Sequence, residues 1–324
     1  MANETKIEWC DSTLNLEMGC AGCELWNPAK GITTCYAGRL VEKYGGRKGW
    51  PKNFRTPQIF PERMNLALRW GDLTGMRRAS KPWLNWYPRL IFLNDMGDTF
   101  TDGLAPDWLA QFLPAISHSS HQFLVLTKRP AAAATFFRKH GLPVNVWIGV
   151  SVTSPDNLSR LDYLRRPPLS NATIRFVSIE PVLRQGIFIK QWTDCLDWVI
   201  AGGGTGPDAT PIHGTVFRKI RNDAKDADLP FFFKSHGEWI HEMDCPPDMA
   251  AAGFPSHEFS DKTLAFRVGP LATHPGIGGK EWREMPLIEK LRSCNGTAQD
   301  LFATAGSSSS ASPMDSGGDG GNAA

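Results

Sequence analysis

The stretch Leu90-Ile91-Phe92-Leu93-Asn94-Asp95-Met96-Gly97-Asp98 contains the pattern that decides the fold. A short apolar run ends in polar residues and glycine, and similar runs recur along the chain. They cover residues 123–126, 146–150, 174–177, 198–201 and 230–233. Helix-like segments separate the runs, at residues 105–116, 157–166 and 215–227 among others. Such alternation is typical of βα units and a parallel sheet. With a further strand at residues 13–18, the sequence predicts an α/β fold, a partial TIM-type (β/α) barrel of about six to seven units.

Polar or glycine residues follow each apolar run directly. In βα barrels the active site is built at the C-terminal ends of the strands. The residues at these predicted strand ends are Asn94, Lys128, Ser151, Glu180, Gly202, Gly203, Gly204 and Lys234. Any one of them alone fits a helix cap or a turn. Because the pattern repeats at every strand end, we expect them to converge on one mouth.

Three cysteines follow the first predicted strand, at Cys20, Cys23 and Cys35. Three thiolates on one loop, with no fourth cysteine close in sequence, suit an iron–sulfur cluster that keeps one iron open. A zinc site with His or Asp as the fourth ligand is one alternative. Ordinary buried thiols are another, because free cysteine packs as a small hydrophobe.

Length, composition and charge limit the class of protein to which the chain can belong. The 324 residues include 41% hydrophobic and 21% charged residues, and the net charge is only +2. This composition fits one large globular domain or two ordinary ones. The first residues lack the apolar core of a signal peptide, and no apolar run is long enough to span a bilayer. We therefore expect a reducing compartment, the cytoplasm, where clustered cysteines indicate metal ligands or catalytic groups before disulfides.

A long insertion, residues 45–88, separates the first unit from the second. It is rich in Lys and Arg with aromatic residues interleaved, a composition that can hold phosphates and stack bases. A solvated helical surface over a small core is the alternative.

The alternation of strand-like and helix-like segments stops after Trp239, so residues 1–240 form the predicted barrel and residues 241–295 an irregular C-terminal lobe. Residues 296–324, rich in Ser and Gly, predict a disordered tail.

These motifs together resemble the radical S-adenosylmethionine superfamily, and within it the phage-associated three-cysteine family. The matching stretches are Lys6-Ile7-Glu8-Trp9, Gly19-Cys20, Cys35-Tyr36-Ala37, Asn94-Asp95-Met96-Gly97-Asp98, Leu126-Thr127-Lys128-Arg129-Pro130, Gly149-Val150-Ser151-Val152, Ser178-Ile179-Glu180-Pro181, Trp198-Val199-Ile200-Ala201-Gly202-Gly203 and Phe231-Phe232-Phe233-Lys234. The commonest superfamily spacing is C-x3-C-x2-C, whereas this chain has C-x2-C and then Cys35 after eleven residues. Cys10 falls where relatives carry a hydroxyl residue, and Cys195, Cys245 and Cys294 lie outside the motif.

The resemblance implies a chemistry. Cys20, Cys23 and Cys35 would hold a [4Fe–4S] cluster, and S-adenosylmethionine would occupy the fourth iron. One-electron cleavage yields a 5′-deoxyadenosyl radical that removes a hydrogen atom from an unactivated carbon. Further roles are assigned by position at the strand ends. Lys128 or Lys234 would hold the cosubstrate carboxylate, and Glu180 and Asn94 would bind its amine or ribose. The adenine would lie beside Gly202, Gly203 and Gly204, and Ser151 is a further cofactor-binding candidate. The catalytic candidates are Glu180 and Lys128.

The resemblance also implies a substrate, a modified thymine in phage DNA. The expected reaction isomerises a nitrogen-linked glycyl thymidine to its carbon-linked form, part of thymidine hypermodification that protects viral DNA from host restriction. The base would be extruded into the barrel mouth. An electron donor such as flavodoxin is the expected protein partner. Two alternatives are a radical enzyme for nucleic-acid repair or group transfer and a non-catalytic, zinc-stabilised DNA-binding module.

Overall fold

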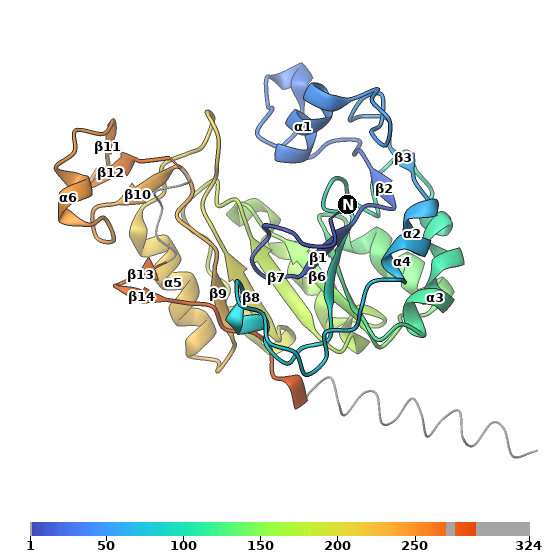
Figure 1. The fold of residues 1–324 in the computed structure, drawn as a ribbon. Helices are drawn as coiled ribbons and strands as arrows, with labels where there is room; N and C mark the ends of the chain where they lie inside the picture. The colour runs from blue at the N-terminus through green and yellow to red at the C-terminus, as the bar shows by residue number, and fades with distance from the viewer. Residues whose placement is uncertain (1, 270–275, 290–324) are drawn as a thin grey trace, which may run out of the picture.

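The computed structural model describes residues 2–269 and 276–289 and is built on a seven-stranded parallel sheet that curls into half a barrel (Figure 1). The strands lie in the order β1-β4-β5-β6-β7-β8-β9. Their bounds are Ser12–Leu14 (β1), Leu90–Leu93 (β4), Gln122–Thr127 (β5), Val146–Ser151 (β6), Arg175–Ile179 (β7), Trp198–Ala201 (β8) and Phe231–Phe233 (β9). Every run predicted after residue 89 is a strand of this sheet. The predicted α/β architecture with a curled parallel sheet is therefore confirmed.

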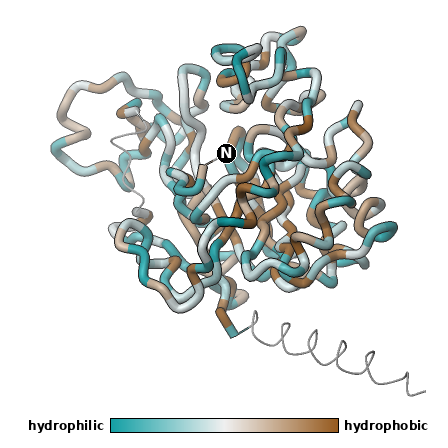
Figure 2. The backbone as a smooth tube through the Cα atoms, turned by 45° about the vertical axis from the view of Figure 1, so that its right-hand side comes forward, coloured by the Kyte–Doolittle hydropathy of each residue, from teal (hydrophilic) through white to brown (hydrophobic). Residues whose placement is uncertain are grey.

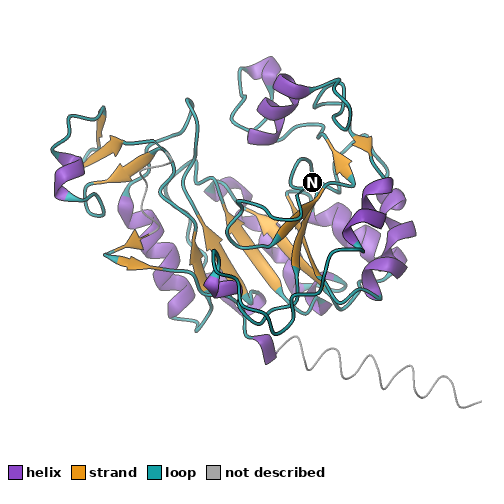
Figure 3. Ribbon diagram, in the orientation of Figure 1, coloured by secondary structure: helices purple, strands orange, loops and turns teal. Residues whose placement is uncertain are grey.

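Helices cover the outer face of the sheet, while loops gather at its mouth (Figure 3). The regular helices there are Leu113–Ser117 (α3), Pro130–His140 (α4) and Gly214–Lys225 (α5), and the 3-10 helices are Pro106–Phe112 (η3), Pro155–Arg165 (η4), Leu169–Asn171 (η5) and Lys190–Cys195 (η6). One large hydrophobic cluster joins these helices to alternate strand residues such as Leu93 and Val125. Figure 2 shows hydrophobic segments concentrated in this central part of the chain.

Two predicted helices are 3-10 segments for part or all of their length. Residues 105–116 form η3 followed by α3, and residues 157–166 belong to η4. Pro114 separates η3 from α3, because it lacks the N–H that an α-helix continuing from η3 would need there. A capping box of Ser154 and Asn157 begins η4.

The first predicted strand, residues 13–18, is interrupted at Asn15. Its amide side chain accepts a bond from Met96 N (3.0 Å) and donates one to Asp95 Oδ1 (2.7 Å). β1 therefore ends at Leu14, and a separate strand Glu17–Met18 (β2) pairs antiparallel with Gln58–Ile59 (β3). The cysteine loop follows β2, with a 3-10 turn at Pro28–Lys30 (η1) and the helix Tyr36–Tyr44 (α1).

The N-terminal segment fills the concave face of the half barrel. Trp9 is buried, with its ring 4.7 Å from that of Phe92 and 6.3 Å from that of Trp198, centroid to centroid. It completes a second cluster of inward-facing side chains that includes Trp147 and Phe232. Aromatic residues on alternate strand positions thus form a solid base beneath the mouth.

The insertion, residues 45–88, contains β3, the helix Glu62–Ala67 (α2) and the 3-10 turn Pro82–Leu84 (η2). Three of its basic side chains hold the fold together. Arg63 donates to Asn15 O (2.7 Å), and Arg78 pairs with Asp11 (2.9 Å). The Lys81 ammonium donates to three backbone carbonyls of residues 5–10. These cations are therefore structural groups, contrary to a reading of the whole insertion as one nucleic-acid surface.

The C-terminal lobe is more regular than predicted. It contains an antiparallel sheet of three strands, Trp239–His241 (β10), Ser256–Glu258 (β11) and Leu264–Arg267 (β12). The helix Pro247–Ala250 (α6) connects β10 and β11. A separate strand pair consists of Gly276–Ile277 (β13) and Lys280–Glu281 (β14). The strands are too short to form runs recognisable in the sequence. The predicted tail, residues 296–324, lies outside the described residues. Within the described part of the chain, no helix combines the length and apolar character needed to cross a membrane.

We predict that Trp9→Ala lowers the free energy of unfolding by about 3–5 kcal/mol, because it leaves a cavity among packed aromatic rings. Denaturant unfolding followed by fluorescence measures this change. Phe188→Ala is the matched control, since Phe188 is 56% exposed and should cost less than about 1 kcal/mol. Equal effects of the two changes would contradict the role given to Trp9.

Candidate functional site

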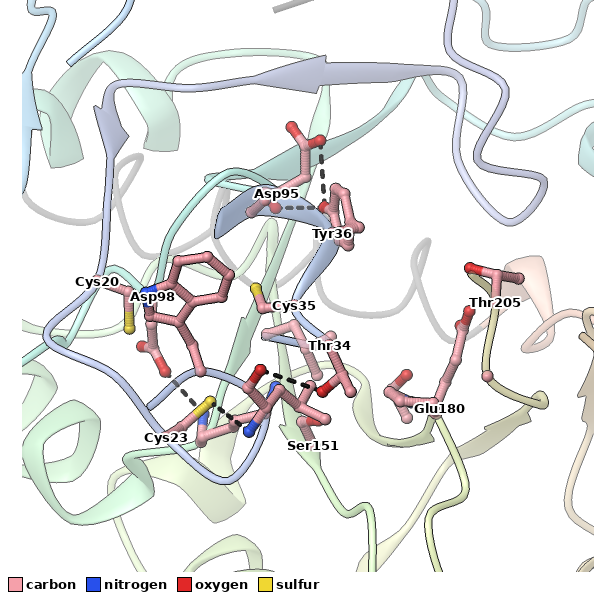
Figure 4. A pocket seen from close by; sticks show the side chains of 18 of the residues that line it. Cys20, Cys23, Thr34, Cys35, Tyr36, Asp95, Asp98, Ser151, Glu180 and Thr205 are labelled. Carbon is pink, nitrogen blue, oxygen red and sulfur yellow. Dashed lines mark hydrogen bonds between the residues drawn. The ribbon is translucent and has the colours of Figure 1, made fainter. Parts of the chain in front are cut away.

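A cavity of about 530 Å³ opens where the parallel strands end. Its volume lies within the range of small-molecule sites, about 300–1,000 Å³. Figure 4 shows side chains from the cysteine loop on one side and from the strand ends on the other. Nine of the eleven predicted site residues line it: Cys20, Cys23, Cys35, Lys128, Ser151, Glu180, Gly203, Gly204 and Lys234.

Asn94 and Gly202, the other two predicted site residues, are not in the cavity wall. The Asn94 side chain is buried and bonded on both sides, accepting from Glu17 N (3.0 Å) and donating to Thr99 Oγ1 (2.8 Å). It therefore positions the loop behind the site and has no free group for a ligand. A Cβ at Gly202 would make only ordinary contacts, 3.4 Å from Lys234 Cβ and 3.5 Å from Glu180 Cδ.

The backbone of the cysteine loop is fixed at each cysteine. Cys20 N donates to Phe54 O (2.7 Å), and Cys35 N donates to Leu25 O (2.9 Å) at the start of α1. Gly19 has φ +109°, and a Cβ there would be 2.9 Å from Phe54 O. A side chain is therefore excluded at the position where the loop enters the site.

Two partly buried arginine contacts tie the loop to the sheet. The Arg129 guanidinium, after β5, donates to Gly22 O (2.7 Å) and pairs with Asp98 (3.3 Å). Arg160, on η4, makes a two-point ion pair with Glu24, at 2.8 and 3.0 Å. Such bidentate arrangements combine charge with fixed geometry. Burial opposes ionisation of Glu24, but the bonds from Arg160 lower the pKa of its carboxyl to about 2.

The three thiols lie around one part of the cavity (Figure 4). Burial raises the pKa of Cys23 to about 11 and raises the pKa of Cys35, while the Lys128 ammonium acts in the opposite direction on both. Cys20 Sγ accepts a bond from the Thr101 hydroxyl (3.5 Å). Across residues 2–269 and 276–289, no three His, Cys, Asp or Glu side chains are grouped so that they could hold a metal ion. The thiols share a cavity without forming a compact site for one ion.

An ion pair crosses the other side of the cavity. Glu180 follows β7 and Lys234 follows β9, and their side chains are bonded to each other. Burial alone would lower the pKa of Lys234, but the Glu180 carboxylate raises it. Both residues line the cavity, so they offer a ligand one positive and one negative group at fixed positions.

Two polar groups in the cavity wall have no protein partner. The Ser151 hydroxyl and the Trp26 indole N–H are buried and unbonded within the described chain. Because an unsatisfied buried polar group costs free energy, such groups are expected to meet a ligand or water. The Glu17 carboxylate behind the cavity is also unbonded, and burial, with the charge of Asp98, raises its pKa well above the usual value.

Sequence reasoning assigned no role to Asp98, Arg129 or Trp26. Asp98 accepts bonds from the Thr127 hydroxyl (2.7 Å) and Lys128 N (2.9 Å), so it holds the loop that carries Lys128. A signal was present, because Asp98 and Arg129 belong to the polar stretches directly after β4 and β5. Nothing in the sequence around Trp26 distinguishes it from the other tryptophans.

The other described cysteines lie away from the cavity wall. Cys10 is buried in the concave cluster, where burial raises its pKa. Cys195 is buried and donates to Trp192 O (3.0 Å), and Cys245 is partly exposed in the C-terminal lobe. Cys294 lies outside the described residues.

Comparison with known families places residues 4–286 within one family, described as "Protein of unknown function (DUF5131)". The chain belongs to this family. No curated protein and no solved structure matches it significantly. The matched region includes the whole parallel sheet and the cysteine loop.

We predict that Arg160→Gln loosens the cysteine loop, because it removes both bonds to Glu24. Alkylation of Cys23 by iodoacetamide in the metal-free protein, followed by mass spectrometry, should accelerate about tenfold, equivalent to about 1.4 kcal/mol. Arg184→Gln is the control, since its pair with Asp156 is exposed (59% and 67%) and includes no residue of the loop. Unchanged alkylation in Arg160→Gln would mean that the ion pair does not restrain Cys23.

Proposed function

We propose that this protein is a radical S-adenosylmethionine enzyme in which Cys20, Cys23 and Cys35 hold a [4Fe–4S] cluster. One observation carries the proposal: the three thiols line one cavity at the C-terminal ends of a curled parallel sheet. In this proposal the half barrel is an open TIM-type barrel. When bound, the cluster and S-adenosylmethionine supply the electron and the hydrogen-atom acceptor for radical chemistry.

The residues present fit such a group. Three cysteine ligands of a cluster bind different irons, so their sulfurs need to surround a space and do not need to converge on one ion. The three thiols line one cavity, which extends beyond them to the strand ends, and this supports the proposal.

Three charged wall residues have roles consistent with binding a zwitterionic cosubstrate. Lys128 carries the cation that faces Cys23 and Cys35, and it would attract a carboxylate beside the thiols. The Glu180–Lys234 pair would orient an amino and a carboxylate group at the opposite wall. Gly203 allows the backbone at His236 to pack against it, because a Cβ there would lie 1.9 Å from His236 O. In this proposal the loops above the cavity would hold the reacting carbon close to these groups.

The substrate that we favour is a nitrogen-linked glycyl thymidine in phage DNA. In the proposed isomerisation, the bond between the glycyl nitrogen and the thymine methylene breaks, and that methylene bonds to the glycyl α-carbon. One hydrogen moves from the α-carbon to the nitrogen, so the atoms balance without net oxidation. The enzyme would act in the host cytoplasm, receive electrons from a donor such as flavodoxin, and help protect viral DNA from restriction.

A second enzyme reading is nucleic-acid repair or group transfer at the same cavity. From another class, a zinc-stabilised DNA-binding module needs four ligands around one ion, at about 2.0–2.3 Å. The arrangement of the described cysteines gives that reading less support, because they form no compact group with a fourth ligand. Colour separates the two classes, since an iron–sulfur protein is brown and a zinc protein colourless.

We predict that Cys20→Ala, Cys23→Ala and Cys35→Ala each abolish cluster assembly. Iron and sulfide content after anaerobic reconstitution measures this, with about four of each expected in the wild type. Cys195→Ala and Cys245→Ala are matched controls that should retain full iron content. Retention of iron by all three loop variants, with loss in either control, would show that the cluster ligands have been misassigned.

We also predict that the reduced enzyme converts DNA carrying the nitrogen-linked base into an isobaric nucleoside. Digestion and mass spectrometry should detect equal mass with new retention and fragmentation. Glu180→Gln and Lys128→Ala should retain iron yet lose about 100-fold or more in turnover, because the reactants are then misplaced. A mass-shifted nucleoside with stoichiometric 5′-deoxyadenosine would exclude the isomerase and favour oxidation or group transfer.

A further inference from the structure

The cysteine-loop lobe, defined here as residues 25–61, has an unusual charge. It contains seven Lys and Arg residues and a single acidic residue, Glu42, in a chain whose net charge is only +2. The cations are Lys30, Arg39, Lys43, Arg47, Lys48, Lys52 and Arg55. The lobe therefore carries a net charge of +6, and the rest of the chain is acidic on balance.

The cations of this lobe are exposed and not neutralised. Lys30, Lys43, Arg47, Lys48, Lys52 and Arg55 are exposed, whereas Arg39 is partly covered. None of the seven forms an ion pair with a described acidic residue. Elsewhere exposed cations often have such partners, as in Lys139–Asp107 and Arg165–Asp194. Unpaired like charges repel each other, so this surface is more stable when an anion binds it.

A second cavity, of about 450 Å³, lies in this lobe, and its wall contains the cations Lys52 and Arg55 and the carboxylate of Glu42. Trp26 and Phe54 line both this cavity and the main one, so the two are separated by shared aromatic side chains. The lobe lies over the mouth of the half barrel (Figure 1). An anion held by Lys52 and Arg55 would therefore lie next to whatever occupies the main cavity.

The basic surface continues from this second cavity to the rim of the main one. Arg47 and Lys43 lie 5.1 and 5.3 Å from the Tyr44 ring, a cation–aromatic arrangement that can also stack a base. Arg39 is one helical turn before Lys43, on the same side of α1. Its guanidinium donates to Thr205 O (3.3 Å), and Thr205 lines the main cavity.

We infer that the cysteine-loop lobe binds the phosphate backbone of a polynucleotide, with a phosphate at Lys52 and Arg55 and the target base in the main cavity. This inference rests on the proposed function for the identity of that base, but the binding itself does not require the cluster. It also places the interface at residues 25–61, whereas the sequence predicted it at residues 45–88, because the side chains of Arg63, Arg78 and Lys81 bond within the fold. A concave cationic site beside aromatic rings fits a phosphodiester better than the flat face of an acidic protein.

The test is binding of fluorescein-labelled DNA duplex, single-stranded DNA and RNA of one sequence, followed by anisotropy from about 50 to 200 mM salt. The variant Arg47→Gln, Lys48→Gln, Lys52→Gln and Arg55→Gln removes four cations of the lobe. The control Arg69→Gln, Arg138→Gln, Arg166→Gln and Lys190→Gln removes four exposed cations outside it. We expect the lobe variant to bind about 10–100-fold more weakly at low salt, with a smaller salt slope, and the control to bind like the wild type.

Three outcomes would overturn the inference: no binding by the wild type, equal loss in both variants, or an unchanged lobe variant. Slower cluster reduction by flavodoxin in a lobe variant that still binds nucleic acid would instead assign the surface to an acidic protein. Iron content distinguishes this failure from failure of the proposed function. If the wild type contains no iron but binds nucleic acid through the lobe, the interface is supported and the radical chemistry is contradicted. The comparison of DNA with RNA identifies which backbone is preferred.

Discussion

The buried carboxylate of Asp98 is the contact on which the arrangement of the site depends. It follows β4 and accepts bonds from Thr127 and from the backbone of Lys128, both at the end of β5. Arg129 pairs with it and reaches Gly22 in the cysteine loop. A charged carboxylate buried at this point is stable only because these donors are all present. One residue thus connects two strand ends and the loop that carries the thiols.

The aromatic base of the half barrel gives this network a rigid support. Trp9, Trp147 and Trp198 fill the concave face, so the strand ends cannot move toward one another. The same packing separates the cavity from the opposite end of the sheet. The candidate ligand-binding side chains therefore lie at the mouth, where the backbone leaves the sheet and can present them to a ligand.

The sheet was predictable because each buried parallel strand is a short apolar run, as at Leu90–Leu93 and Trp198–Ala201. The convergence of Lys128, Ser151, Glu180 and Lys234 followed from topology, since the C-terminal ends of parallel strands share one edge. Asn94 had the same position but turned inward to bond Glu17 N, a choice that only the packed structure determines. The sequence also could not show which basic residues are structural and which are exposed. Arg63 and Arg55 occur in similar sequence surroundings and differ only in the groups that surround them in the folded protein.

The Glu180–Lys234 pair has a consequence for which molecules can enter the cavity. A lone anion would be attracted by Lys234 but repelled by Glu180, and a lone cation would be attracted by Glu180 but repelled by Lys234. The pair therefore disfavours binding of simple ions of either sign. A molecule that carries both charges can replace each partner with its own group and leave neither buried charge unpaired. The wall therefore acts as an electric dipole, which selects zwitterions and also sets the direction in which they lie.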